Sequence, residues 1–316
     1  MSSKSPAVRQ HHACDRESKV HAGYVQHEPG LFVSYAFTKG DQRACMEDRT
    51  WSGKIGPETY LYMLLDGHNG IEAVDHVTEH FPSMLMHYLK EYSKSERSGR
   101  HTSPRTRSRY VRKALEHSFQ HIHDTIREDE AGTTMSLILS HHNELWSANV
   151  GDSPIYQVSE RCIRPLFENH NITANPGERA RLEKTGDYSF DHEHYTFFKG
   201  SDAGLAMSRA IGDKSMGPGI LQKPYLTRIR TPFLFIAMGS DGFFDVVNDP
   251  TPLRLWAYQP SMELSAAHVL QLRNNQHEQH DNISIMLLFQ SDSWKTKQAK
   301  EQSGDISTVL KSLSLP

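Results

Sequence analysis

Three strand-like, largely apolar segments of this chain each stop at an aspartate beside a glycine. The segments are Thr59–Leu65, Glu144–Val150 and Phe233–Met238, and the aspartates that follow them are Asp66, Asp152 and Asp241. The run before Asp66 has no polar face, which is typical of a strand buried on both sides. A carboxylate at the end of such a strand is costly to bury unless it is paired or binds a cation.

Two further acids extend this pattern. Asp281 precedes an apolar run, and Glu47 lies between two strand-like segments. Carboxylates gathered in one place repel one another, and all-oxygen ligand sets favour Mg²⁺ or Mn²⁺. Several acids suggest two ions, and two-metal sites commonly carry out displacement at phosphorus. Each ending taken alone could still be a hairpin closed by Asp-Gly.

Arg43 is the candidate for binding an anion, because the guanidinium fork fits phosphate oxygens. The alternative for the charged cluster around it, 41–49, is a solvated turn. The chain has no GxxxxGK[ST] loop, so nucleotide binding is not indicated. It also lacks a GxSxG elbow and a cysteine in a phosphate-loop context, so a covalent intermediate is not indicated.

The composition excludes several classes of protein. The 316 residues carry 35 basic and 38 acidic side chains, whereas a nucleic-acid binder would show a basic face and a high pI. No apolar stretch approaches the ~20 residues of a membrane span, and no secretory signal is visible. The three cysteines are too scattered for a disulfide framework and suggest a reducing compartment. We expect a monomer in the cytoplasm and/or nucleus, without nucleic-acid or membrane partners.

One domain, 28–291, accounts for the periodic part of the chain. Residues 1–27 and 292–316 are polar and patternless, and we expect disordered tails there. Pro82 should kink or restart the helix that the spacing predicts after Gly70. The segment 93–109, rich in Ser and Arg, reads as an exposed flexible loop that could be phosphorylated or dock an acidic partner.

Seven short blocks together resemble the protein phosphatase 2C family of metal-dependent serine/threonine phosphatases. In chain order they read RACMED, LLDGHNG, AGTTM, ANVGDS, GLAMSRAIGD, GSDGFFDVV and HDNISIMLL. One block alone is a weak signal, but the ordered set, which spans Arg43 to Leu288, is specific. The resemblance implies an α+β fold, a four-layer α-β-β-α sandwich of two antiparallel sheets flanked by helices, with metals in a cleft at one end.

The resemblance also implies a role for each acid. Two Mg²⁺ or Mn²⁺ ions would share Asp66 as a bridging ligand, and a third, weaker ion would use Asp152 with Asp241 and Asp245. The remaining ligands would be Glu47 and the Gly67 carbonyl for one ion, and Asp241 and Asp281 for the other.

Three more residues match the family's catalytic machinery. Arg43 would bind the substrate phosphate, His68 would donate a proton to the leaving alkoxide, and Asp48 would hold metal-bound waters. The implied activity is hydrolysis of phosphoserine and phosphothreonine in protein substrates by direct attack of a metal-bridging hydroxide. A catalytically weak pseudophosphatase acting as a scaffold or regulator is the alternative, and a two-metal phosphodiesterase or nuclease is a second.

Two departures from the family pattern stand out. Asn69 replaces the usual second glycine of the DGHNG turn, and we expect the turn to survive because asparagine tolerates left-handed backbone geometry. The region 169–204 is the poorest match, and the resemblance places it in the flap beside the active site. Substrate preference is therefore the least transferable property.

Overall fold

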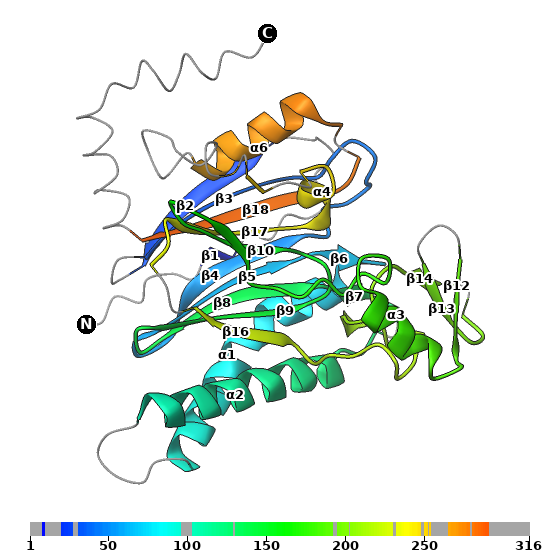
Figure 1. The fold of residues 1–316 in the computed structure, drawn as a ribbon, viewed down its shortest axis with the longest axis horizontal. Helices are drawn as coiled ribbons and strands as arrows, with labels where there is room; N and C mark the ends of the chain where they lie inside the picture. The colour runs from blue at the N-terminus through cyan, green and yellow to red at the C-terminus, as the bar shows by residue number, and fades with distance from the viewer. Residues whose placement is uncertain are drawn as a thin grey trace.

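The computed structural model describes most of the chain from Val8 to Gln290 (Figure 1). The described ranges are 8–9, 20–27, 31–95, 103–128, 130–191, 195–201, 203–229, 232–247, 250–251, 253, 265–278 and 280–290. The predicted tail 292–316 lies outside them.

Two six-stranded antiparallel sheets form the centre of the molecule. The first sheet has the order β1 (Val8–Arg9), β4 (Arg49–Gly56), β5 (Thr59–Leu65), β8 (Met135–His141), β9 (Glu144–Val150) and β16 (Tyr225–Ile229). The second has the order β11 (Ile163–Pro165), β10 (Ile155–Val158), β17 (Phe235–Gly239), β18 (Ile283–Gln290), β3 (Leu31–Thr38) and β2 (His21–His27).

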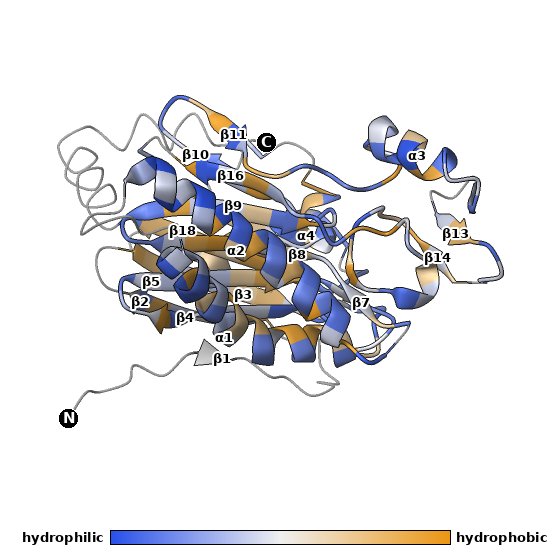
Figure 2. Cartoon of the chain, turned by 90° about the horizontal axis from the view of Figure 1, so that it is seen from below, coloured by the Kyte–Doolittle hydropathy of each residue, from blue (hydrophilic) through white to orange (hydrophobic). Residues whose placement is uncertain are grey.

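Helices cover the outer faces of both sheets. The first sheet carries α1 (Glu72–Ser95) and α2 (Pro104–Thr125), while α6 (Ser265–Gln276) lies on the second, and α4 (Asp241–Phe244) follows β17 (Figure 1). Figure 2 shows hydrophilic residues on the outward faces of α1 and α2 and hydrophobic strands behind them. The predicted α-β-β-α sandwich is confirmed.

Strand β5 shows why the layers form. Tyr62 and Leu64 pack between the two sheets, whereas Leu61, Met63 and Leu65 point to the opposite face and pack in the cluster that includes α1 and α2. All seven residues of β5 are buried, as the apolar run predicts. Full burial of each large apolar side chain contributes ~1.5–3 kcal/mol, so a strand of this composition is stable only at the centre of such a stack.

Two small sheets lie at one end of the sandwich. The first contains β6 (Gly67–His68), β7 (Gly132–Thr133) and β15 (Ile211–Gly212). The second contains β12 (Tyr188–Phe190), β13 (Thr196–Phe198) and β14 (Gly204–Leu205), and it projects from the sandwich together with α3 (Pro176–Glu183), as Figure 1 shows. The 3₁₀ turn Lys214–Met216 follows β15.

The structure corrects the predicted helix boundaries. Residues 93–109 are not one loop, because α1 extends to Ser95 and α2 begins at Pro104. The N-terminus of α2 has Ser103 as its cap, whose Oγ accepts a hydrogen bond from the Thr106 amide at 3.1 Å. A serine before a proline is a helix-start signal that the charged composition concealed. Pro82 lies inside α1 without restarting it, because packing of the apolar helix face outweighs propensity.

The prediction for the N-terminal tail is wrong. The tail 1–27 includes strand β1 and strand β2, the latter pairing with β3 over its full length. The residues of β2 alternate between exposed and half-buried, so β2 is an edge strand with too few apolar residues to be predicted from the sequence.

The cysteines also differ from the prediction. Cys45, which we expected to stay reduced, is disulfide-bonded, whereas Cys162 is a free, exposed thiol. Among the described helices, none combines the length and hydropathy needed to cross a membrane.

Candidate active site

Acids from both sheets meet at one end of the sandwich. Asp66 follows the last residue of β5 in the first sheet, and Asp241 begins α4 just after β17 of the second. The Asp241 amide donates a hydrogen bond to Asp66 Oδ2 at 3.3 Å. The backbone of Asp66 is fixed by Thr134, whose amide donates to the Asp66 carbonyl at 2.9 Å. The two strand endings that the sequence singles out are therefore adjacent in space.

Burial and mutual repulsion make these carboxyl groups poor acids. Burial is the main cause that raises the pKa of Asp66 well above its ordinary value, and the charges of Asp241 and Asp48 add to it. Burial likewise raises the pKa of Asp48 and of Asp152 to about 7, again with repulsion from Asp241. Asp245, next to the same cluster, has a pKa raised to about 6 for the same reasons.

Several carboxylate oxygens in this cluster are buried without a partner. Both oxygens of Asp48, a residue only 3% exposed, lack a hydrogen-bond partner within the described part of the chain, as does Oδ1 of Asp152. Unpaired buried acceptors that repel one another are the donor set that a hard cation would satisfy. The acidic residues present therefore fit Mg²⁺ or Mn²⁺. Among the described residues, no three His, Cys, Asp or Glu side chains already converge as a complete metal-binding group.

The Glu47 segment packs directly on the turn after Asp66. A Cβ atom on Gly67 would approach the Glu47 carbonyl oxygen and Val74 Cγ1 to 2.7 Å each, so only glycine fits there. Glu47 Oε1 accepts a hydrogen bond from the Gly70 amide at 2.8 Å. The Glu47 amide in turn donates to Asn282 Oδ1 at 2.6 Å. Glu47 and Gly67 are thus neighbours, as the resemblance implies.

Arg43 is paired with one of the predicted metal ligands. Its Nη2 donates to Asp281 Oδ2 at 2.6 Å, and the Arg43 side chain remains 48% exposed. Asp281 lies just before β18, and the Asn282 amide also donates a hydrogen bond to Asp281 Oδ1 at 2.7 Å. Arg43 therefore borders the acidic cluster and is open to an incoming anion.

His68 has a partner that the sequence did not predict. Its Nε2 lies 2.8 Å from each carboxylate oxygen of Asp213, whose side chain is 1% exposed. Burial lowers the pKa of His68, but the Asp213 charge more than reverses this, so the pKa is raised. Asp213 ends the block GLAMSRAIGD, but only the pairing of β7 with β15 brings it to His68.

The turn at Asn69 survives the replacement of glycine, as expected. Asn69 has a φ of +57°, in the left-handed region that asparagine tolerates, and Gly70 has a φ of +123°. Despite this departure from the family pattern, the preceding strand β6 forms and His68 pairs with Gly132 of β7.

The comparisons with known proteins agree with this geometry. The family described as Protein phosphatase 2C matches residues 36–283, which is most of the chain. The chain belongs to the protein phosphatase 2C family. Among curated relatives of the family, "Probable protein phosphatase 2C 52" of Oryza sativa subsp. japonica is 26% identical over 286 residues, covering 88% of this chain and 54% of the relative. "Protein phosphatase 1F" of Homo sapiens is 27% identical over 271 residues, covering 79% and 55%.

Two solved structures share the fold of this chain. "Serine-threonine phosphatase 2C from Toxoplasma gondii" aligns with a TM-score of 0.67 at 16% identity, covering 86% of this chain and 99% of that one. "A C.elegans sex determining protein" aligns with a TM-score of 0.66 at 22% identity, covering 85% and 68%. This chain spans about half the length of the rice and human relatives above.

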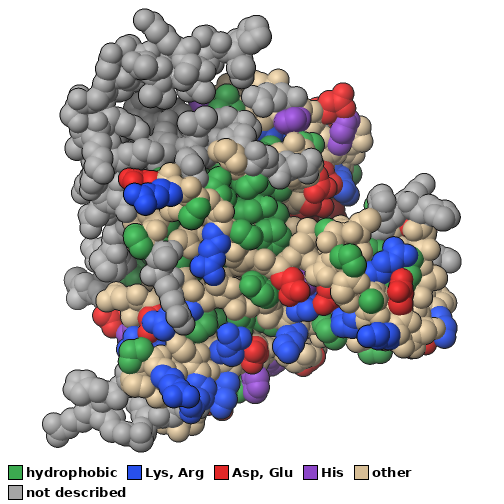
Figure 3. All heavy atoms as spheres, in the orientation of Figure 1, with side chains coloured by type: hydrophobic (Ala, Val, Ile, Leu, Met, Phe, Trp, Pro, Cys, Tyr) green, Lys and Arg blue, Asp and Glu red, His purple; other side chains and the backbone are tan. Residues whose placement is uncertain are grey.

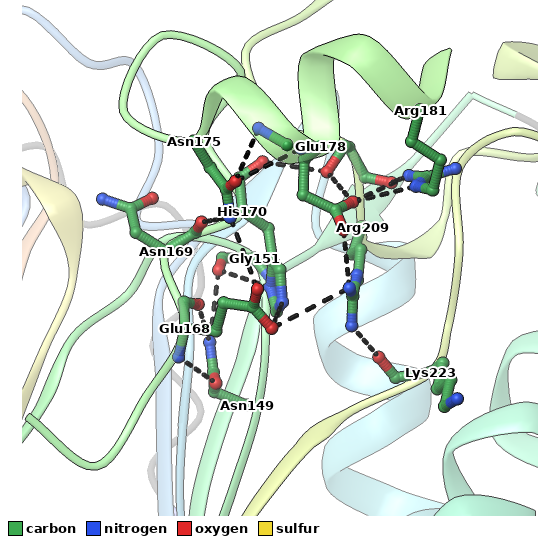
Figure 4. Close-up of polar contacts among 12 residues, drawn as sticks. Asn149, Gly151, Glu168, Asn169, His170, Asn175, Glu178, Arg181, Arg209 and Lys223 are labelled. Atoms are coloured by element: carbon green, nitrogen blue, oxygen red, sulfur yellow. Dashed lines mark hydrogen bonds and ion pairs between the residues drawn. The ribbon is translucent and has the colours of Figure 1, made fainter. Parts of the chain in front are cut away.

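A polar network of this phosphatase 2C chain links α3 and the segment 168–171 to the end of β9 (Figure 4). Glu178 in α3 accepts hydrogen bonds from Arg209 Nη2 and Ser208 Oγ, both at 2.6 Å, and from Arg181 Nη2 at 2.9 Å. His170 Nδ1 lies 3.1 Å from the Gly151 amide, at the end of β9. Burial lowers the pKa of His170 to about 3, so the ring is neutral.

The same segment reaches the predicted third-metal ligand. Asn171 Nδ2 donates to Asp152 Oδ2 at 3.2 Å. Residues 169–171, which begin the region 169–204 that resembles the family least, are therefore positioned by hydrogen bonds to the end of β9 and to Asp152.

Proposed function

We propose that this chain is a metal-dependent protein serine/threonine phosphatase, with the activity in the domain 28–291. The observation that carries the proposal is the meeting of Asp66 and Asp241 from two sheets, 3.3 Å apart through the Asp241 amide, among buried acids of raised pKa. Membership in the protein phosphatase 2C family supports the same reaction. The substrates would be proteins that carry phosphoserine or phosphothreonine.

The residues that would hold Mg²⁺ or Mn²⁺ are those whose oxygens are buried here. Asp66 would serve as a ligand for both of two ions, and Asp152 would help to hold a third, more weakly bound ion. The other ligands would be Glu47, the Gly67 carbonyl, Asp241 and Asp281, with Asp48 orienting coordinated water. When bound, such ions supply charge neutralisation and a water acidic enough to ionise near neutral pH.

The chain's own groups handle the phosphoryl group and the leaving oxygen. Arg43 would bind the equatorial oxygens of the phosphate, exchanging its contact with Asp281 for a charge-assisted pair of hydrogen bonds. His68 would donate a proton to the departing alkoxide, which is too basic to leave unprotonated. Because Nε2 faces Asp213, Nδ1 is the nitrogen that would carry this proton.

The test is hydrolysis of a phosphothreonine peptide with Mn²⁺ and with EDTA. We expect EDTA to abolish activity, and Asp66→Ala and Asp241→Ala to reduce kcat at least about a hundredfold, a loss typical of removed transition-state stabilisation. Glu79→Ala, which removes an exposed carboxylate of α1, should change nothing. A folded protein without activity in Mn²⁺ would overturn the proposal in favour of a scaffold. Activity that survives EDTA and both substitutions would exclude the metal mechanism.

A further inference from the structure

A positively charged cavity lies away from the acidic cluster, between α2 and the edges of both sheets. It has a volume of about 760 Å³ and opens to solvent. Its charged lining consists of Arg105, Arg109 and Arg112 from α2, Arg228 from β16 and Arg164 from β11. Figure 3 shows Lys and Arg side chains gathered over α2 on this face of the molecule.

The positive charge of this arginine cavity is only partly balanced. Glu144 Oε1 lies 3.0 Å from Arg228 Nη2, and the exposed Arg112 is 3.9 Å from Glu116. Among the described residues, neither Arg105 nor Arg164 has an acidic partner, and no described residue that lines the cavity is acidic. Arg105 and Arg164 come from two different elements and have no matching carboxylate among the described residues, which favours an anionic ligand beside them.

A buried hydrogen-bond donor in the cavity wall also has no acceptor. Trp146 of β9 lines the cavity and is 3% exposed, and its Nε1 has no hydrogen-bond partner within the described ranges. An unpaired buried N–H group costs ~1–3 kcal/mol. The Nε1 atom has no access to solvent, so a ligand oxygen could accept from it only after neighbouring side chains shift, and the arginines are the groups that would bind the anion.

The cavity is remote from the catalytic end of the molecule. His123, near the C-terminus of α2, accepts a hydrogen bond from the Gly212 amide at 3.2 Å, beside the partner of His68. Arg109 lies fourteen positions earlier in α2, ~21 Å away at 1.5 Å per residue. An anion in the cavity would therefore not occupy the active site.

The neighbouring strand indicates which kind of anion fits. Strand β16 pairs only with β9 among the described strands, so its outer edge presents backbone groups that an extended peptide could use. Nucleic acids and lipid head groups have no matching backbone. Arginine clusters bind phosphoryl groups and acidic side chains of peptides through bidentate contacts.

We propose that the arginine cavity docks an acidic, phosphorylated segment of the protein substrate, apart from the phosphothreonine being hydrolysed. This inference rests on the proposed function for the identity of the substrate. The two tethered contacts would raise the local concentration of substrate at the active site and lower KM without changing kcat.

The kinetic test uses two phosphothreonine peptides, one neutral and one with a tail of glutamates and phosphonate analogues of phosphoserine. About ten residues would separate the phosphothreonine from the tail, which spans ~33 Å when extended. We expect the tail to lower KM about fivefold to tenfold. Arg105→Glu/Arg164→Glu should abolish this advantage and leave kcat and KM for the neutral peptide unchanged. If the thermal midpoint of this double variant is lower than that of the wild type, the milder double variant Arg105→Gln/Arg164→Gln replaces it in the same assay.

The matched control is Lys90→Glu/Lys94→Glu on α1, which makes the same change in net charge at exposed positions. This variant should keep the tail advantage. Loss of the advantage in both variants would mean that only net charge matters and would overturn the docking site. If the neutral peptide is not hydrolysed at all, the proposed function fails instead.

Binding without catalysis separates the two proposals further. The tail alone, labelled with fluorescein, would be titrated with protein in EDTA, and its anisotropy measured. We expect binding that is unchanged in Asp66→Asn and at least tenfold weaker in Arg105→Glu/Arg164→Glu. Tighter binding of a single-stranded oligonucleotide or of phosphatidylserine vesicles than of the tail would overturn the peptide assignment, as would binding that Asp66→Asn abolishes.

Discussion

At the scale of single residues, the space beside Gly132 decides how His68 is held. A Cβ atom at Gly132 would lie 2.0 Å from Asp213 Oδ2, so glycine is what allows the carboxylate to reach the imidazole. Asp213 itself has a φ of +50°, a strained geometry for a residue other than glycine. The carboxylate thereby approaches the imidazole closely enough to hold its Nε2 with both oxygens.

Asp213→Asn should therefore impair proton donation by His68 more than phosphate binding. We expect kcat for a phosphothreonine peptide to fall about tenfold to a hundredfold. Hydrolysis of p-nitrophenyl phosphate should fall much less, because p-nitrophenolate leaves without protonation. The ratio of the two kcat values is the measurement, with Asp187→Asn, an exposed flap carboxylate, as the control. Equal losses on both substrates would mean that Asp213 is only structural.

At the scale of elements, a buried carboxylate helps to attach α3 to the segment between β14 and β15. Glu178 is 6% exposed and is held by Arg209 and Arg181. Burial raises the pKa of Glu178, but hydrogen bonds from Arg209, Ser208 and Arg181 outweigh it and lower the pKa to about 2. The ionised form is thus part of the folded flap.

Glu178→Gln should lower the free energy of unfolding by about 3 kcal/mol, because it leaves two guanidinium groups without their acid. Glu183→Gln is the matched control on the same helix. Its ion pair with Arg179 is exposed and should contribute under about 1 kcal/mol. Because the folded pKa is lowered, the contribution of Glu178 is complete above the unfolded pKa and lost as pH falls toward 2. Urea unfolding should show the gap between wild type and variant closing between pH 5 and pH 2, and a constant gap would contradict this role.

At the scale of the whole molecule, the acidic cluster opposes folding when no cation is bound. Asp48 and Asp152 have a folded pKa of about 7, above the unfolded value. The protonated carboxyl groups do not repel one another, so this destabilisation is absent below the unfolded pKa of 3.8; stability is lost as pH rises from there to about 7 and then levels off. We expect the thermal midpoint of EDTA-treated protein to fall between pH 5 and pH 8.

Mn²⁺ should remove most of this dependence, since binding to the folded state alone stabilises it. Differential scanning calorimetry at several pH values would measure both effects. Asp48→Asn supplies a control, because it should flatten the profile of the metal-free protein. A midpoint that rises from pH 5 to pH 8 in EDTA would show that the acids are not destabilising.

The sequence predicts the buried strands of this molecule better than its edge strand and its short strands, for physical reasons. The apolar run before Asp66 identifies β5 because burial on both faces demands it. Strand β2 and Asp213, the partner of His68, were not predicted, for two different reasons. β2 is an exposed edge without an apolar pattern, and Asp213 depends on two-residue strands that carry no periodicity. The charged segment 93–109 concealed the start of α2, where the cap signal is only Ser103 and Pro104.

The bond between the Asp241 amide and Asp66 has a consequence for how the protein is made. The two residues belong to different sheets and are 175 positions apart in the chain. Asp281 precedes β18, which inserts between β17 and β3 and is the last described strand to leave the ribosome. The nascent chain therefore lacks the assembled acidic cluster through most of its synthesis, and the proposed activity would begin only once the second sheet has closed.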